Sequence, residues 1–302
     1  MKTITDISGI RVGHWSDFDA KTGCTAVLFD NGAVCGADVR GCAPGTRETD
    51  LLRGYNLVEK INAIMLCGGS AFGLDAASGA MRFLEEHNIG IDVGVTKVPI
   101  VPAAVIFDLA VGKHNVRPDQ AAGYYACEAA SKSFDTGSVG AGCGATIGKA
   151  YGAIYSDKGG IGTACIDLEN GIKVAALIVV NALGDVYDPD SGKLLSGAHE
   201  GNRFLALNNE TAIKGRSFTN TTIGIIATNA TLTREGATKL AGMGHDGLAL
   251  AIRPVHTTLD GDTLFGISTC EIDIDSSYIL PILTAATKVA VMAIHNAVNI
   301  AP

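Results

Sequence analysis

The stretch SFTNTTIGIIATNATL, from Ser217 to Leu232, decides how the rest of the chain is interpreted. Its centre, Thr222–Thr228, is an apolar run rich in β-branched residues, and such runs are typical of a buried strand. Two polar residues, Asn220 and Thr221, stand directly before this run. Thr233 follows it as a suitable N-cap for a helix that we expect to extend to about Ile252. The segment therefore predicts a buried strand that leads into a long helix.

Strands and helices alternate irregularly through the remaining sequence. We predict strands at Ala63–Cys67, Val174–Val180 and Leu264–Cys270, and a hairpin in which Asp30-Asn31-Gly32 joins Cys24–Phe29 to Ala33–Val39. We also predict one helix that ends near His87, a second helix at about Gln120–Ser133 and a C-terminal helix. The segment Asp188–Ser217 is predicted to be an exposed connector. Because strict βαβ alternation is absent, a layered α/β sandwich is favoured over a doubly wound parallel sheet.

Composition narrows the classes of partner. The 302 residues are 47% hydrophobic and 18% charged, which is enough apolar material for a substantial core. A formal net charge of −8, without any basic run, argues against nucleic acid as a partner. The N-terminus carries no apolar signal segment, so we expect a cytoplasmic protein. The apolar stretch Ile279–Ile300 is interrupted by Pro281, Lys288 and His295, which favours a core helix over a membrane span.

Common cofactor and metal motifs are missing from the sequence. The glycine-rich run Gly137–Gly148 does not have the spacing of a P-loop. Its backbone N–H groups could instead point into a site and form an oxyanion hole. There is no GxSxG nucleophile elbow, no HExxH and no CxxC pair among the eight cysteines. A metal cluster is conceivable at Asp260, Asp262, Asp273 and Asp275, but the spacing of a calcium-binding EF-hand is absent. We expect neither a metal nor a cofactor.

The Asn220-Thr221 bond allows two interpretations. Thr221 is either an ordinary polar residue at the start of a strand or a nucleophile released by cleavage of the chain. In the second case Thr221 Oγ attacks the carbonyl of Asn220, and hydrolysis of the resulting ester leaves a new α-amine on Thr221. Such an amine has a reference pKa of about 7.7–8.0 and can act as a general base for its own hydroxyl.

Several segments occur together in the order found in one known family. They are GIRVGHW (9–15), GCAPGTRETDLL (41–52), GGSAFGLDAASGAMRFLEE (68–86), GAGCGATIGK (140–149) and ATNATL (227–232). Over nearly the whole chain the sequence resembles the L-aminopeptidase D-esterase/amidase group of N-terminal-nucleophile hydrolases. That group includes β-peptidyl aminopeptidases and 6-aminohexanoate-oligomer (nylon-oligomer) endohydrolases, and the Asn-Thr pair is similar to the latter branch.

The resemblance implies a four-layered αββα sandwich and a homo-oligomer, often a tetramer. It also implies that a single domain, 1–302, is cut by itself into a large subunit (1–220) and a small subunit (221–302). Thr221 would be the nucleophile, Asp260 and Asp262 would orient it and its amine, and Asn181 would donate to the oxyanion. Lys149 matches a residue beside the nucleophile. The substrate implied is a small peptide or another amide.

Two departures from the family leave the specificity open. Asn229-Ala-Thr-Leu232 replaces an Asp-Ala-Pro-Leu element of many relatives, and no counterpart is evident for the aromatic residue that shapes the amine pocket of aminopeptidases. Exopeptidase and endo-acting amidase both remain possible. The sequence is also compatible with two other functions: an acyltransferase of the ornithine acetyltransferase type, and a non-catalytic small-molecule binder whose chain stays uncut.

Overall fold

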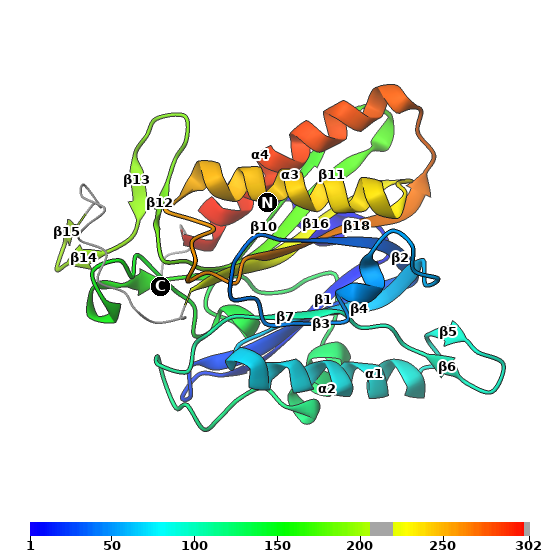
Figure 1. Ribbon diagram of the computed structural model, residues 1–302, viewed down its shortest axis with the longest axis horizontal. Coiled ribbons are helices and arrows are strands. Elements are labelled where there is room, and N and C mark those ends of the chain that lie inside the picture. The colour runs from blue at the N-terminus through cyan, green and yellow to red at the C-terminus, as the bar shows by residue number, and fades with distance from the viewer. Residues whose placement is uncertain (206–219, 299–302) are drawn as a thin grey trace.

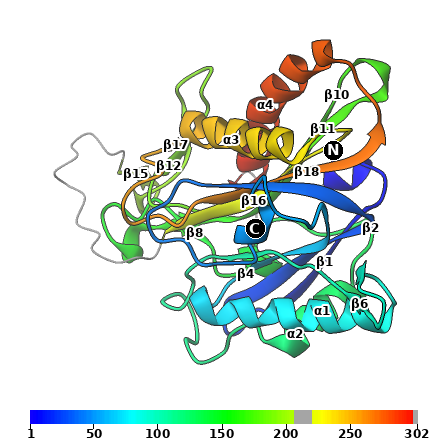
Figure 2. The same cartoon turned by 45° about the vertical axis from the view of Figure 1, so that its right-hand side comes forward.

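Two helical layers enclose the strands in the computed structural model, which describes residues 1–205 and 220–298. Helices α3 (Arg234–Ala251) and α4 (Ile279–Val298) cover one side of the strands, and α1 (Ala76–Glu86) and α2 (Gln120–Glu128) cover the other (Figures 1 and 2). The order of layers is helix, strand, strand, helix. The expected αββα architecture is therefore confirmed.

Nine of the described strands form one hydrogen-bonded sheet that is folded into two layers, and the other strands form four small separate sheets. The strand order of the large sheet is β10-β11-β16-β18-β2-β4-β7-β3, with β1 beside β2. The long strands are β1 (Ile10–Asp17), β2 (Thr22–Val39), β4 (Lys60–Cys67), β10 (Gly160–Asp167), β11 (Lys173–Asn181), β16 (Thr221–Ala230) and β18 (Thr263–Ile272). The short strands are β3 (Thr46–Arg47), β5 (Ile91–Asp92), β6 (Lys97–Val98), β7 (Ala103–Val105), β8 (Thr146–Ile147), β9 (Asp157–Lys158), β12 (Asp185–Tyr187), β13 (Leu194–Ser196), β14 (His199–Glu200), β15 (Arg203–Phe204) and β17 (Ile252–Arg253).

Three apolar clusters fill the spaces between the four layers. Because successive residues of a strand point to opposite faces, each buried strand contributes to two of them. In β11, Leu177 and Val179 face the cluster between the two strand layers, whereas Ile178 and Val180 face α3 and α4. On the other side, Met65 of β4 belongs to the cluster beneath α1 and α2. The near-continuous apolar runs of the sequence thus reflect burial on both faces.

The predicted hairpin around Asp30-Asn31-Gly32 is wrong. The chain continues through these residues as the single strand β2. Its first half pairs with β1 and β4, and from Val34 to Val39 it pairs with β18. Gly32, with φ of 67°, lies where the register against β4 is interrupted. The Asp-Asn-Gly element therefore makes an irregularity that lets one strand serve both layers, rather than a reversal of the chain.

The strand β16 and the helix after it form as expected. β16 is buried along its whole length, between antiparallel β11 and parallel β18. The side chain of Thr233 accepts a hydrogen bond from the N–H of Gly236 at 3.2 Å, which caps α3. α2 is shorter than predicted because Ser131 leaves the helix to exchange two backbone hydrogen bonds of 3.0 Å with Val12.

Two other predicted segments are described only in part. The connector at 188–217 contains β13, β14 and β15, and its residues 206–217 lie outside the described residues. Residues 276–298, which include α4, are long and apolar enough to span a membrane by length and composition. One such helix is weak support for a span, because core helices meet the same criterion. α4 buries Ile282, Val289 and Ile294 against the sheet and α3, as expected of a core helix.

Candidate active site

The Asn220-Thr221 peptide bond lies at the first residue of β16, in the middle of the sheet. Thr221 is the cross-strand partner of Asn181, the last residue of β11, and Asn220 forms a parallel bridge with Asp260. Asn220 and Thr221 are only 2% and 6% exposed. Predicted site residues from three distant parts of the chain therefore meet around one buried peptide bond.

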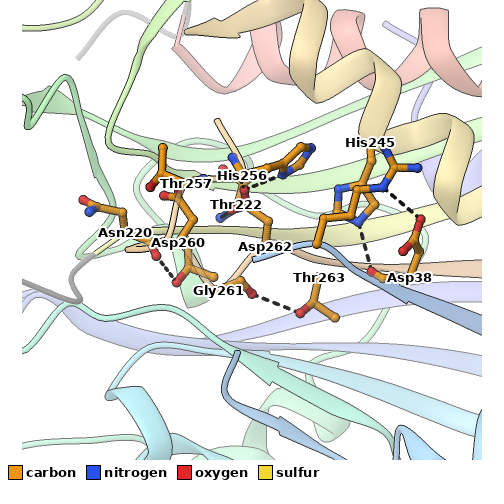
Figure 3. A network of polar contacts seen from close by, with 12 residues as sticks. Asp38, Asn220, Thr222, His245, His256, Thr257, Asp260, Gly261, Asp262 and Thr263 are labelled. Atoms are coloured by element: carbon orange, nitrogen blue, oxygen red, sulfur yellow. Dashed lines mark hydrogen bonds and ion pairs between the residues drawn. The ribbon is translucent and has the colours of Figure 1, made fainter. Parts of the chain in front are cut away.

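The carbonyl group of Asn220 is bound from two directions. The backbone N–H of Gly261 donates to its oxygen at 3.1 Å, and the hydroxyl of Thr221 donates to the same oxygen. Figure 3 shows Gly261 beneath the carbonyl, in the turn that carries Asp260 and Asp262. An N–H group aimed at a carbonyl oxygen stabilises the negative charge that develops there during nucleophilic attack.

The turn of Asp260, Gly261 and Asp262 is fixed by the segment that begins at Arg40. The N–H of Arg40 donates to the carbonyl of Asp262 at 3.0 Å, and that of Ala43 donates to the carbonyl of Asp260 at 2.9 Å. A Cβ on Gly41 would lie 2.3 Å from the backbone nitrogen of Asp262, so only glycine allows this approach. The GCAPG motif near position 41 therefore supports the site from a distant part of the sequence.

The two carboxylates of the turn have different surroundings. Asp262 accepts from the N–H of Thr222 at 2.6 Å and from Nδ1 of His256 at 2.8 Å. Asp260 accepts from the N–H of Thr257 at 2.6 Å. Burial, together with the negative charge of Asp262, raises the pKa of Asp260 to about 6. Asp260 thus exchanges protons close to neutral pH.

Lys149 and Asn181 form the opposite wall of the site. Lys149 Nζ donates to Asn181 Oδ1 at 2.8 Å and to the Asn181 carbonyl at 3.2 Å. Burial lowers the pKa of Lys149 to about 7, against the opposing effect of the charges of Asp260 and Asp108. A lysine with this pKa is partly neutral near pH 7 and can accept a proton.

The position of Lys149 depends on the glycine-rich run. Gly148 has φ of 70°, and a Cβ there would lie 2.1 Å from the backbone nitrogen of Ala198. The N–H of Thr146, in the same run, donates to Asn181 Oδ1 at 3.0 Å. The Nδ2 group of Asn181 donates to the carbonyl of Phe107 at 3.3 Å. The run therefore orients the amide of Asn181, the residue to which the family resemblance assigns binding of the oxyanion.

A cavity of 530 Å³ opens beside the Asn220 residue. This volume is typical of a small-molecule site. Its walls are mainly apolar, and its lining residues are Phe107, Ala110, Val111, Thr146, Lys149, Gly152, Ala153, Ser156, Leu183 and Asn220. A small substrate in this cavity would lie against the buried peptide bond and Lys149.

Comparison with known proteins identifies the family. The sequence profile of peptidase family S58 matches residues 2–302. The chain belongs to peptidase family S58. This S58 peptidase is 45% identical over 288 residues to an uncharacterized aminopeptidase of Mycobacterium tuberculosis (strain ATCC 25618 / H37Rv), a match that covers 89% of this chain and 82% of the relative. It is 30% identical over 282 residues to the 6-aminohexanoate-oligomer endohydrolase of Kocuria sp. (strain KY2), covering 90% and 76% of the two chains.

A solved structure shares the fold. The L-aminopeptidase D-Ala-esterase/amidase from Ochrobactrum anthropi, described as a variant of the Ntn hydrolase fold, matches with a TM-score of 0.72 at 16% identity, covering 98% of this chain and 85% of that one. The resemblance inferred from the sequence motifs is confirmed. This S58 peptidase is a hydrolase of the peptidase or amidase type, which sets aside the non-catalytic binder.

The structure separates the four aspartates considered as a metal cluster. Asp273 accepts from Thr231 at 2.9 Å, and Asp275 caps the short helix that begins at Ser276. Within residues 1–205 and 220–298, no three His, Cys, Asp or Glu side chains are grouped closely enough to hold a metal ion. Only Asp260 and Asp262 belong to the site.

Sequence reasoning missed two residues of this S58 peptidase that touch the site. They are Gly261 and His256, and neither is among the site residues predicted from the sequence. Gly261 donates to the Asn220 carbonyl, and His256 donates to Asp262. The signal for Gly261 was its place between two aspartates, whereas nothing in the local sequence indicated the role of His256.

Proposed function

We propose that this S58 peptidase is a self-processing amide hydrolase that uses Thr221 as its nucleophile. The observation that carries the proposal is the contact of the Thr221 hydroxyl with the carbonyl of its own preceding residue, which also accepts the N–H of Gly261. A hydroxyl beside a polarised carbonyl, in a buried site with a lysine of lowered pKa, is the arrangement that an N-to-O acyl shift requires.

In the processing step, Thr221 Oγ attacks the carbonyl carbon of Asn220 and its proton passes to Lys149, which is partly neutral because burial lowers its pKa to about 7. The N–H of Gly261 stabilises the oxyanion on Asn220. The C–N bond then breaks, and the nitrogen of Thr221 takes a proton to become an amine. Water hydrolyses the ester between Asn220 and Thr221, which leaves a carboxylate on Asn220 and a free hydroxyl on Thr221.

In the hydrolytic step, the new α-amine of Thr221 serves as general base for the Thr221 hydroxyl. The hydroxyl attacks the substrate carbonyl, and Asn181, the cross-strand neighbour of Thr221, donates its amide N–H to the oxyanion. The amine product leaves with the proton that the base accepted, and water then hydrolyses the acyl ester. Asp260 and Asp262 orient the new terminus. No metal or organic cofactor is needed for these steps.

The proposed substrate is a small peptide or another amide. The apolar cavity beside Asn220 supports an acyl group without charge, and an endo-acting mode on aminoacyl or ω-amino-acid oligomers fits it as well as an exo-acting one. We also propose that the protein is cytoplasmic, acts without nucleic acid or membrane, and assembles as a homotetramer. Exposed apolar residues of α4, such as Leu280, support an oligomer.

Intact-mass analysis with N-terminal sequencing tests the proposal directly. The purified protein should consist of two fragments, one of which begins at Thr221. Thr221→Ala should remain uncut, whereas Thr221→Ser keeps a hydroxyl and should be cut more slowly. Thr231→Ala, at an exposed threonine ten residues further on, is the matched control and should be cut like the wild type. A wild-type chain that stays whole over several days would refute the proposal.

An acyltransferase of the ornithine acetyltransferase type would use the same nucleophile. The two functions differ in the group that receives the acyl chain, which is water in one case and an amine in the other. Incubating the processed protein with an amide substrate, with and without millimolar free amino acids, distinguishes them. We expect free acid as the product in both cases.

A further inference from the structure

His256 lies next to the proposed active site in an unusual backbone conformation. It stands in the loop between β17 and β18, with φ of 56°, a left-handed region that most non-glycine residues avoid. Its N–H and its Nδ1 both donate to the same oxygen of Asp262, at 3.1 and 2.8 Å. Two hydrogen bonds to one carboxylate oxygen thus hold the residue in this conformation (Figure 3).

Asp262 connects His256 to β16, the strand that begins with Thr221. Its other oxygen accepts from the backbone N–H of Thr222 at 2.6 Å. Thr222 directly follows Thr221, and Asp262 is only 1% exposed. Because the carboxylate is shielded from solvent, loss of the imidazole would remove one of the two donors to the oxygen that His256 binds and leave only the backbone N–H of residue 256. A shift of Asp262 would then move the start of β16.

His245 supports the ring of His256 from the other side. The two rings meet edge to face, with their centroids 4.8 Å apart. His245 Nε2 donates to the backbone carbonyl of Asp38 at 2.9 Å. Burial lowers the pKa of His245 to about 4, so this ring is neutral at working pH. His245 therefore packs as a neutral wall and directs Nδ1 of His256 toward Asp262.

We propose that His256 is a positioning residue for Thr221, acting through Asp262 on the backbone of Thr222. The proposal rests on the proposed role of Thr221. His256 does not touch Thr221 itself, and its effect is on the rate of processing and of catalysis rather than on substrate binding.

The charges around His256 provide a second readout. The carboxylates of Asp260 and Asp262 face it from the turn before β18, and neutral His245 faces it from α3. Beyond His245, the side chain of Asp38 pairs with Arg40 at 3.1 Å, and Arg40 also reaches Asp246 of α3 at 3.3 Å. A positive charge on His256 lowers the pKa of Asp260, in opposition to the burial and the Asp262 charge that raise it. Removal of that charge should raise the pKa of Asp260, so the processing rate should begin to fall at a higher pH on the acid side of its pH profile.

The test compares three full-length variants with the wild type by the rate at which the Thr221 fragment appears between pH 5 and 9. His256→Ala removes the ring donor and disfavours the backbone conformation. His256→Asn keeps a side-chain N–H donor, and asparagine tolerates positive φ better than most residues. His114→Asn, at an exposed histidine, is the matched control. Thermal unfolding of each variant reports on the fold.

We expect His256→Ala to process about 10²-fold more slowly than the wild type, because displacements of about 1 Å near a reacting group have effects of this size. His256→Asn should recover most of the rate at pH 8, with an acid limb that lies at higher pH. In the processed protein, kcat should fall while KM stays within about twofold. These results together would support positioning.

A His256→Ala rate within about threefold of the wild type would overturn the proposal, as would equally slow Ala and Asn variants that both unfold at lower temperature. Failure of the proposed function gives a different result, because the wild type and the His114→Asn control would then also fail to release a fragment beginning at Thr221.

Discussion

Replacing Gly261 by alanine should slow self-processing while leaving the fold in place. A Cβ at this position would lie 2.6 Å from the carbonyl oxygen of Ala43 and 3.0 Å from Thr221 Oγ1. An ordinary carbon–oxygen contact is about 3.4 Å, so the turn must move by about 0.8 Å relative to Ala43. The N–H of Gly261, now 3.1 Å from the Asn220 oxygen, moves with it.

The size of the effect follows from this displacement. Loss of one oxyanion donor costs about 10²–10³ in rate, and a shift of about 1 Å near the reacting group costs about 10²-fold. We therefore expect processing of Gly261→Ala to be about 10²-fold slower. The overpacking should also lower the free energy of unfolding by about 1–3 kcal/mol.

The assay is a time course of intact mass after purification at low temperature, with a thermal melt of the uncut chain. Gly54→Ala is the matched control, because a Cβ there meets only the end of the flexible Glu235 side chain, at 2.9 Å. If Gly261→Ala processed within threefold of the wild type while its melting temperature fell, the backbone N–H would have no role in the cleavage.

Four further predictions use other parts of the site. Lys149→Met should slow processing by about 10²-fold or more, since it removes the group proposed to take the hydroxyl proton; an unchanged rate of fragment release would exclude that role. The wild-type rate should rise from pH 5.5 to 8, because Asp260 becomes a carboxylate above its pKa of about 6 and Lys149 becomes neutral above its pKa of about 7; a rate that falls over this range, measured by quenched time points, would contradict the assignment. In processed protein, Asn181→Ala should lower kcat by about 10²–10³ with little change in KM, and steady-state kinetics that show the opposite split would place Asn181 in substrate binding. Leu280→Glu, on an α4 residue that is 71% exposed, should reduce the mass measured by light scattering if this face joins copies of the chain, whereas an unchanged mass would place the interface elsewhere.

Local sequence signals predicted those parts of the fold that depend on neighbours in the chain. The buried run after Thr221 and the cap at Thr233 both involve residues within a few positions of each other. The hairpin at Asp30-Asn31-Gly32 failed because the deciding interaction is the pairing of β2 with β18, more than two hundred residues away. α2 ended early for a similar reason, the backbone pairing of Ser131 with Val12.

In the site too, the sequence predicts the residues that take part but not the tertiary contacts that they make. Motif resemblance predicted Thr221, Asn181, Asp260, Asp262 and Lys149, and the structure brings all five together around one peptide bond. It could not predict which donors each carboxylate binds, because the partner of Asp262 lies in a loop with an unusual backbone angle. The low pKa of Lys149 likewise arises from burial by the surrounding tertiary structure.

The place of β16 and β18 in the sheet has a consequence for the durability of a cut chain. Both strands belong to the part of the sequence after Thr221, yet their outer neighbours, β11 and β2, belong to the part before Asn220. The two pieces therefore interlock as complementary fragments, and separating them would expose strand edges on both. Unfolding of processed protein should then be irreversible on heating and governed by a rate, whereas uncut Thr221→Ala keeps its two halves tethered and able to refold together.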